Sequence, residues 1–399
     1  HQGFGRVGGD GVMAKLGELY KITSGGTPSR THSEYYEDGT IPWVKTGDLK
    51  DKYLFETDEK ISQLGLENSS ARIYLKNTVL LAMYGATIGA TSILKIDAAT
   101  NQACAAFSPR EDVLPEYLYA FLESQKDKFI KDAVGGAQPN LSAGYLKTIE
   151  FKLPSLEQQT RITRNLSKID ELLLLRKQQI AKLDGLIKAR FVEMFGDPAD
   201  NVNNLPASPM TAICQIIDGD RGKNYPKQEE FSDSGFCLFL NAKNVTAQGF
   251  SFENCTYITE EKDALLRNGK LCRGDVVLTT RGTIGNLAFY DTSVPYENIR
   301  INSGMVILRM NKQVVSEIFF IEQFKMQLDS IKSRIASGSA QPQLPISTMN
   351  KIEMILPPIE LQNQFAAFVE RVSQQKQTVQ QSLEKLKLMK KALMQEYFG

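Results

Sequence analysis

The sequence has 399 residues, of which 42% are hydrophobic and 23% charged, and its formal net charge is +1. This length and composition are typical of a globular chain with room for two domains of about 150 residues, and they exclude disorder and collagen-like repeats. The most apolar stretch, residues 79–94, is interrupted by Gly85 and Gly89 and is shorter than the roughly 18 residues that indicate a membrane span.

The cysteines and the first 13 residues indicate where in the cell the protein is located. The five cysteines, Cys104, Cys214, Cys237, Cys255 and Cys272, form no CxxC pair, so we expect a cytoplasmic location, reduced thiols and no bound metal. Residues 1–13 are rich in glycine and lack the charged start and apolar centre of a signal peptide. We expect this segment to be an added leader or tag remnant.

Charge is unevenly distributed along the chain. Residues 1–155 carry 17 basic and 19 acidic side chains, and residues 197–359 carry 16 and 18. The segments 156–196 and 360–399 are basic instead, with 8 against 5 and 6 against 4. Any nucleic-acid role must therefore depend on local basic patches, because no large positive field surrounds the whole chain.

A long internal repeat organises the sequence. Residues 135–196 align without a gap on residues 338–399, pairing GGAQPNL with GSAQPQL and KLDGLIKARFVEMFG with KLKLMKKALMQEYFG. A weaker match upstream places Tyr84 opposite Arg281 and Gly85 opposite Gly282, with Ala86 as one inserted residue. The sequence thus predicts a duplicated unit: a variable block of about 140 residues followed by a more similar block of about 40.

The similar blocks predict two long helices, over residues 156–195 and 359–398. Each follows a proline-bearing segment, ends at a Phe-Gly pair and has apolar residues at alternating steps of three and four. The apolar face of each helix must be covered by another apolar surface. We therefore predict that the two helices pair antiparallel over about 60 Å. The predicted seam consists of Ile162, Leu166, Ile169, Leu173, Ile180, Leu183 and Ile187 in the first helix and Phe365, Val369, Val372, Val379, Leu383, Leu386 and Leu393 in the second.

The variable blocks indicate a mixed α and β structure. Strand-like runs cover residues 78–83 and 275–280, and helix-like runs cover 115–133 and 316–333, with glycine-rich loops between such elements. We predict an α/β (mixed α+β) fold with a pseudo-two-fold internal repeat, in which the two long helices separate two similar globular domains. The expected domains are 14–155 and 197–357, and the expected spacer helices are 156–196 and 358–399.

Signatures of catalysis are absent from the sequence. No phosphate-binding GxxxxGK[ST] or dinucleotide-binding GxGxxG segment occurs, and neither His1 nor His32 belongs to a metal or nucleophile pattern. Asp197 and Pro198 stand at a predicted helix end, where Asp-Pro is a stop signal. The sequence therefore predicts a chain that is not an enzyme.

Several segments together resemble a known family. SGGTPSR at 24–30, IPWVKTGDL at 41–49, RGTIG at 281–285, the repeated GxAQPxL loop and LPSLEQQTRI at 153–162 look like the specificity subunit of Type I restriction-modification systems. The resemblance covers nearly all of residues 14–399. It implies two target-recognition domains, each reading half of a split DNA sequence, held apart by the conserved helices.

The resemblance also implies partners. These are double-stranded DNA, methyltransferase (modification) subunits that bind S-adenosylmethionine, and a restriction translocase subunit that uses ATP and Mg, while this chain itself binds no cofactor. One departure from the family pattern is that Leu361 occupies the position equivalent to Gln158. This difference interrupts the family's pattern at the start of the second helix.

The glycine-rich loops supply candidate DNA contacts. Arg281 has the planar fork that pairs with guanine, and Asn241, Asn244 and Gln341 have amides that pair with adenine. Each residue also has a plainer interpretation, as a solvated charge or as part of a turn, and Gln138 and Gln341 favour a shared structural role. The full set of candidates is Thr27, Ser29, Arg30, Lys45, Thr46, Tyr84, Thr87, Gln138, Asn140, Arg221, Lys223, Asn241, Lys243, Asn244, Arg281, Thr283, Asn286, Gln341 and Gln343.

Two other functions remain open at this stage. The chain could be a coiled-coil scaffold whose end domains bind proteins, or the recognition half of a larger modification or restriction enzyme. A salt-dependent DNA band shift in the presence of a methyltransferase subunit separates the scaffold from a DNA reader. Neighbouring genes for a separate methyltransferase and an ATP-dependent nuclease would exclude the larger enzyme.

Overall fold

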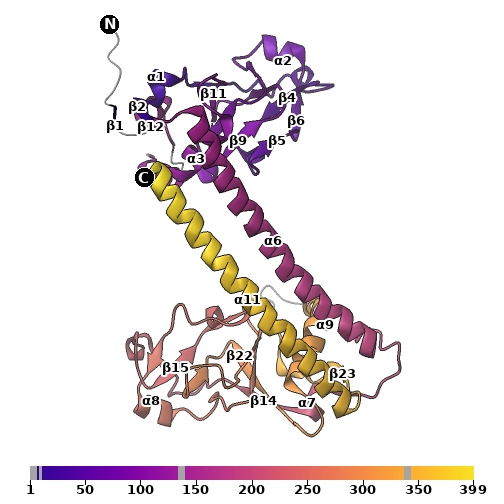
Figure 1. The fold of residues 1–399 in the computed structure, drawn as a ribbon. Helices are drawn as coiled ribbons and strands as arrows, with labels where there is room; N and C mark the ends of the chain where they lie inside the picture. Colours follow the sequence, from indigo (N-terminus) through magenta and orange to yellow (C-terminus); the bar gives the residue numbers. More distant parts are fainter. Residues whose placement is uncertain (1–6, 9–10, 134–139, 337–342) are drawn as a thin grey trace. The chain divides into compact units, whose positions relative to one another are not determined.

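The computed structural model describes residues 7–8, 11–133, 140–336 and 343–399 (Figure 1). The chain divides into two compact units. Unit 1 comprises residues 1–176 and 382–399, and unit 2 comprises residues 177–381. Each unit contains one globular block and one stretch of each long helix.

The two long helices are α6 (Leu156–Phe195) and α11 (Ile359–Phe398), each of 40 residues. They have the bounds that the heptad pattern predicts. The side chains and backbone amides of Ser155 and Gln158 cap the start of α6 reciprocally, at 3.2 and 3.3 Å. The helix ends before Gly196, whose φ of 81° suits glycine. Pro358 and Leu361 replace the capping pair in the second copy, so α11 starts without this box.

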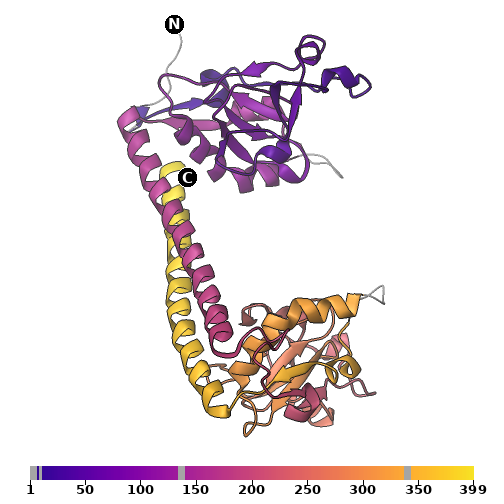
Figure 2. The ribbon, with the colours of Figure 1, turned by 90° about the vertical axis from the view of Figure 1, so that its right-hand side faces the viewer.

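Within each unit, α6 and α11 lie side by side and run antiparallel (Figures 1 and 2). In unit 1, Asn165 of α6 bonds the Tyr397 hydroxyl at 3.3 Å, and Asp170, further along α6, pairs at 2.5 Å with Lys390, which precedes Tyr397. In unit 2, Asp184 pairs with Lys376 at 2.6 Å. Residue numbers thus rise along α6 while they fall along α11.

The predicted seam residues face the protein interior. Ile162, Leu166, Ile169, Ile187, Phe365, Val369, Val372, Val379 and Leu383 are buried, and Leu173, Ile180, Leu183, Leu386 and Leu393 are half-buried. On the outer face of α6, Leu172, Leu174 and Leu175 stay exposed. Burial of the apolar stripe is the main source of stability for helices of this length.

The described residues of unit 1 form three sheets. The five-stranded sheet has the order β3 (Thr23–Ser24), β11 (Cys104–Phe107), β8 (Val79–Ala82), β9 (Thr91–Leu94) and β5 (Tyr53–Leu54). The four-stranded sheet has the order β6 (Glu59–Ile61), β4 (Ile41–Val44), β10 (Ala98–Thr100) and β7 (Ile73–Tyr74), and the third consists of β1 (Val7–Gly8), β2 (Gly11–Lys15) and β12 (Glu150–Leu153). The helices of the block are α1 (Leu16–Leu19), α2 (Gln63–Glu67), α3 (Pro115–Ser124), α4 (Lys126–Asp132) and α5 (Ala143–Thr148).

Unit 2 repeats this plan. Its main sheet has the order β14 (Cys214–Asp218), β22 (Met305–Met310), β19 (Val276–Thr279) and β20 (Leu287–Phe289). The smaller sheets are β18 (Tyr257–Ile258), β15 (Cys237–Leu240) and β21 (Ile299–Ile301); β13 (Ala207–Pro209) and β23 (Glu353–Ile355); and β16 (Val245–Thr246) and β17 (Gly249–Phe250). The helices of the block are α7 (Met210–Ile213), α8 (Glu260–Leu265), α9 (Glu317–Ala336) and α10 (Ile346–Met349).

The strand pairings identify equivalent elements in the two units. In each unit the second sheet contains one parallel pair, β4 with β10 and β15 with β21. The predicted strands correspond to β8 and β19. The single helix predicted over 115–133 is instead two helices, because Gln125, with ψ near 0°, interrupts it between α3 and α4.

A buried glutamine joins each block to its long helix. Gln159 accepts a hydrogen bond from the Leu114 amide at 2.8 Å and donates to two carbonyls, and Gln362 does the same with the Ser316 amide at 3.0 Å. Both glutamines are 0% exposed. Since a buried amide without partners is costly, these bonds fix the block against the start of its helix.

Candidate nucleic-acid interface

The loops that follow β8 and β19 pair with the loops that precede α5 and α10. In unit 1 the Leu141 amide donates to the Met83 carbonyl at 2.8 Å, and in unit 2 the Leu344 amide donates to the Thr280 carbonyl at 2.9 Å. Isolated antiparallel bridges then join Tyr84 to Asn140 and Arg281 to Gln343. Candidates that are about 60 residues apart in the sequence therefore face one another in each unit.

A third loop packs beside this pair. The Asn101 and Asn302 side chains cap the amides of Ala103 and Gly304 at 3.1 and 2.9 Å. The Ala103 carbonyl in turn accepts a hydrogen bond from the amide of Met83, which follows β8, and the Gly304 carbonyl accepts one from the amide of Thr280, which follows β19. The loops 101–103 and 302–304 are therefore equivalent, and the side chains at their tips are Gln102 and Ser303.

The loops after β3 and β14 approach this third loop closely. A Cβ atom at Gly25 would lie 1.9 Å from the Thr100 carbonyl oxygen, and one at Gly219 would lie 2.3 Å from that of Asn302. Only glycine fits such an approach. It brings the Thr27 hydroxyl to 2.5 Å from the Gln102 amide oxygen, and an Arg221 guanidinium nitrogen to 3.3 Å from the Ser303 carbonyl.

A further loop carries a matched turn. The Lys45 amide donates to the Asp48 side chain at 2.7 Å, and the Asn241 amide donates to the Asn244 side chain at 2.9 Å. We call these four loops and the facing residue the loop surface of each unit. It consists of residues 24–30, 45–48, 84–87, 101–103 and 140 in unit 1, and of 218–224, 241–244, 281–283, 302–304 and 343 in unit 2.

One candidate contact requires correction. Asn244 is 1% exposed, and its amide nitrogen donates to the carbonyls of Ser251 and Asn254 at 3.0 Å each. Its oxygen already accepts from Asn241. Pairing with adenine needs both amide atoms, so Asn244 is a structural residue of the turn and does not present an edge to a base.

Basic candidates of unit 1 share one carboxylate. Arg30 and Lys45 lie 2.6 and 2.5 Å from the Glu59 oxygens, and the Arg30 guanidinium also lies 4.1 Å from the centre of the Tyr36 ring. The hydrogen bonds from Lys45 and Arg30 hold the pKa of Glu59 below its usual value. The cluster therefore keeps one net positive charge at neutral pH.

Basic candidates of unit 2 differ in their pairing. Arg221 pairs with Asp218 at 3.0 Å. Arg281 is exposed and donates from Nε to the Gln343 amide oxygen at 3.1 Å. Among the described residues no carboxylate pairs with Arg281, so its charge stays available for a ligand.

The other candidates occupy varied positions. Ser29, Asn140, Lys223, Lys243, Thr283 and Gln343 are exposed, and Thr46, Thr87, Asn241 and Asn286 are half-buried. The Thr87 hydroxyl donates to the Tyr84 carbonyl at 3.1 Å, and Asn286 donates to the Val245 carbonyl at 2.9 Å. Gln138 and Gln341 lie outside the described residues.

Sequence reasoning missed Gln102 and Ser303. The signal was present in the segments TNQAC and INSGM, which share an asparagine before the tip residue. The shift between these segments is 201 residues and not 203, because the stretch from Asn302 to residue 338 is two residues longer than the stretch from Asn101 to residue 135, so the ungapped repeat did not align them. The matching hydrogen bonds of the Asn101 and Asn302 side chains show that the two segments are equivalent.

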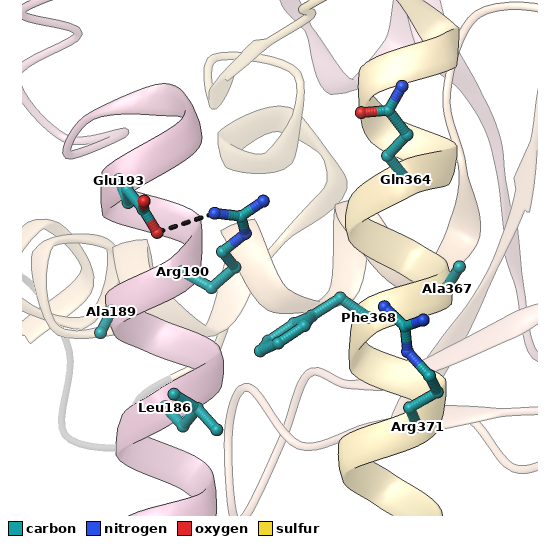
Figure 3. A pocket seen from close by; sticks show the side chains of 8 residues that line it. All are labelled: Leu186, Ala189, Arg190, Glu193, Gln364, Ala367, Phe368 and Arg371. Carbon is teal, nitrogen blue, oxygen red and sulfur yellow. Dashed lines mark hydrogen bonds and ion pairs between the residues drawn. The ribbon is translucent and has the colours of Figure 1, made fainter.

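The long helices of unit 2 also form a groove of about 870 Å³. Figure 3 shows Leu186, Arg190 and Glu193 of α6 facing Gln364, Phe368 and Arg371 of α11. Arg190 pairs with Glu193 at 2.9 Å, and its guanidinium lies 6.0 Å from the centre of the Phe368 ring. In the described part of the chain no side chains cluster as a metal site, and no helix is both long and apolar enough to cross a membrane.

Comparisons with known proteins agree with this two-unit plan. Residues 10–184 and 210–388 both match the family described as Type I restriction modification DNA specificity domain. The MjaIX specificity subunit of Methanocaldococcus jannaschii is 25% identical over 98% of this chain and 93% of its own length. The EcoR124I/EcoR124II specificity subunit of Escherichia coli is 26% identical over 39% of this chain and 40% of its own length.

Solved structures share the fold. The Type I restriction-modification S subunit from M. genitalium aligns over 99% of this chain and 98% of its own, with 16% identity and a TM-score of 0.57. A chain from a structure described as the basis of complex assembly and conformational transition of the type I R-M system aligns over 98% of each chain, with 16% identity and a TM-score of 0.62. With two matched domains that span most of its length, this chain belongs to the family of Type I restriction-modification DNA specificity subunits.

Proposed function

We propose that each loop surface contacts one half of a split double-stranded DNA target. The observation that carries this proposal is the shared frame of the two units: equivalent backbone bridges, side-chain caps and close glycine contacts hold different side chains at matched positions. The pairs are Thr27 and Arg221, Lys45 and Asn241, Tyr84 and Arg281, Gln102 and Ser303, and Asn140 and Gln343. A constant frame with variable polar tips suits two readers of different half-sites.

We also propose that the chain acts without catalysing a reaction, as the recognition part of a complex. Methyltransferase subunits with S-adenosylmethionine would modify the target, and a translocase subunit with ATP and Mg would cleave unmodified DNA. Because chromosomal DNA would be the ligand, we place the chain in the cytoplasm. The protein scaffold and the separated enzyme half are weaker alternatives, because neither explains the matched loop surfaces.

The groove of Figure 3 is our candidate docking surface for one methyltransferase subunit. The 47% exposed Leu186 on α6 and the half-buried Phe368 on α11 offer apolar area there, and Arg371 offers a positive charge. Apolar anchors beside arginine are common at the centre of protein interfaces. A partner with an apolar ridge and acidic side chains fits this groove.

We predict that DNA binding by the chain alone is weak and that methyltransferase subunits strengthen it. The globular blocks have a small excess of acidic residues, and most of the arginines in the loop surfaces are already paired, so few free cations remain for phosphates. Salt titration of binding measures the number of phosphate contacts, since each contributes about 0.9 to the slope of log affinity against log salt. We expect a steeper slope for the complex by at least about one contact; equal slopes contradict this division of contacts.

A further inference from the structure

Arg281 is held at both its backbone and its side chain. The Arg281 amide donates to the Gly304 carbonyl at 3.2 Å, and the preceding Thr280 bonds the same carbonyl through its amide at 2.8 Å and its hydroxyl at 3.0 Å. At the far end, Nε of the guanidinium donates to Gln343. The long side chain therefore has a fixed root and a fixed direction.

The contact with Gln343 determines which guanidinium atoms remain available. Nε is engaged, so the end of the fork, with the two Nη nitrogens, is the part that a ligand meets. Two parallel N–H donors in one plane match the O6 and N7 acceptors of guanine in the major groove. Arg221, by comparison, has one Nη nitrogen on Asp218 and on the Ser303 carbonyl, so it lacks a free fork.

The equivalent pair in unit 1 has a different chemistry. Tyr84 and Asn140 make the same backbone bridge, and Tyr84 is 42% exposed. A phenol has one hydroxyl and no planar pair of donors. At equivalent positions, unit 2 thus presents the guanidinium group of Arg281 and unit 1 presents the aromatic ring of Tyr84.

We propose that Arg281 and Gln343 form one guanine-reading element, in which Gln343 is a positioning residue that orients the Arg281 fork. This inference rests on the proposed contact between the loop surface and DNA. It assigns a guanine to the half-site of unit 2 and no arginine-read guanine to the equivalent position in unit 1. It also makes Gln343 a determinant of specificity that itself touches no base.

A double-mutant cycle tests whether the two residues act as one. The full chain, assembled with methyltransferase subunits, is bound to a randomised DNA library as wild type, Arg281→Ala, Gln343→Leu and the double variant. We expect Arg281→Ala to reduce the preference for guanine at one base pair by about tenfold or more. We expect Gln343→Leu to reduce the same preference by about 3- to 10-fold, and the double variant to equal Arg281→Ala, because the fork that Gln343 orients is then absent.

Three further variants test whether Gln343 orients the Arg281 side chain, or whether the two residues act only through local structure or charge. Arg281→Lys keeps the charge without the fork, so affinity should be retained while the guanine preference falls. Gln343→Glu keeps an acceptor of the same length, so the preference should survive while overall affinity drops. Asn140→Leu is the matched control in unit 1, and it should leave the guanine position unchanged.

Several results would overturn the inference. A uniform loss of affinity across all sequences for Arg281→Ala, with rescue by lysine, means that Arg281 contacts phosphate only. Additive effects of Arg281→Ala and Gln343→Leu mean that Gln343 does not act through Arg281. A wild-type complex that selects a split target, unaltered by Arg281→Ala, overturns this inference alone, whereas a wild-type complex that selects no sequence contradicts the proposed function as well.

Discussion

Replacing Phe191 by alanine is expected to lower the free energy of unfolding of unit 2 by about 3–5 kcal/mol, the range for truncating a fully buried phenylalanine. Phe191 lies on α6 and is 0% exposed. Its ring centre is 5.1 Å from that of Phe195, 5.3 Å from that of Phe319 on α9 and 5.3 Å from that of Phe365 on α11. The substitution opens a cavity where α6, α9 and α11 meet. It therefore destabilises the globular block of unit 2 and weakens its packing against α6 and α11.

Hydrogen exchange is the appropriate measurement, because it reports on each unit separately. Protection should fall in α9 and in the unit 2 stretches of α6 and α11, while the sheets of unit 1 keep theirs. Met394→Ala is the matched control: residue 394 is the repeat equivalent of residue 191, packs against the core of unit 1 and is only half-buried. For Met394→Ala we expect a smaller loss of protection, confined to unit 1. If Phe191→Ala lowers protection equally in both units, the division into two units is contradicted.

Replacing Asp263 by alanine is expected to destabilise unit 2 by about 3–5 kcal/mol, because it leaves a buried arginine without its counter-charge. Arg300 is 5% exposed, and its Nε lies 2.5 Å from an Asp263 oxygen. The remaining guanidinium nitrogens donate to three carbonyls of the segment that contains α8 and the turn after it. The pair therefore ties this segment to β21.

The matched control for Asp263 is the second cation on the same carboxylate. Lys270 lies 2.5 Å from the other Asp263 oxygen, and its side chain is 43% exposed. Lys270→Ala should cost no more than about 1 kcal/mol, because solvent screens an exposed pair. If Asp263→Ala and Lys270→Ala lower the free energy of unfolding equally in chemical denaturation, the buried pair of Asp263 and Arg300 does not tie α8 and the turn after it to β21.

The pH dependence follows from the same carboxylate. Burial raises the pKa of Asp263, but the hydrogen bonds from Lys270 and Arg300 outweigh it and hold the pKa below its ordinary value. A carboxyl whose pKa is lowered by folding contributes stability that is complete above its unfolded pKa, about 3.9, and is lost as the pH falls through the folded pKa. Asp263→Asn should remove this contribution to acid unfolding of unit 2.

Local and periodic features were predictable from the sequence. The bounds of α6 and α11 follow from the apolar spacing, the preceding prolines and the Phe-Gly ends, since these signals lie within the helices themselves. The strands β8 and β19 follow from short apolar runs before glycine. The pairing of the two helices follows from the repeat, because each apolar stripe needs a partner of the same length.

Features that depend on contacts between distant residues were not predictable. Asn244 was chosen for its amide, but the carbonyls that bury and satisfy it come from residues 251 and 254. Gln125 ends α3 inside an otherwise helical pattern. The Arg281 pairing crosses 62 residues. The asparagine before Gln102 and the asparagine before Ser303 do not fall opposite one another in the ungapped repeat. Such positions become visible only when the two units are compared bond by bond.

The most direct test of the central claim is to map the bases that the assembled complex methylates in DNA of random sequence. If each loop surface reads one half-site, sequencing of the modified positions should yield one motif with two specified segments separated by base pairs of any identity. Changes in the loop surface of unit 2 should alter one segment and leave the other intact. A single uninterrupted motif, or one in which changes in either unit alter both segments, would contradict the account.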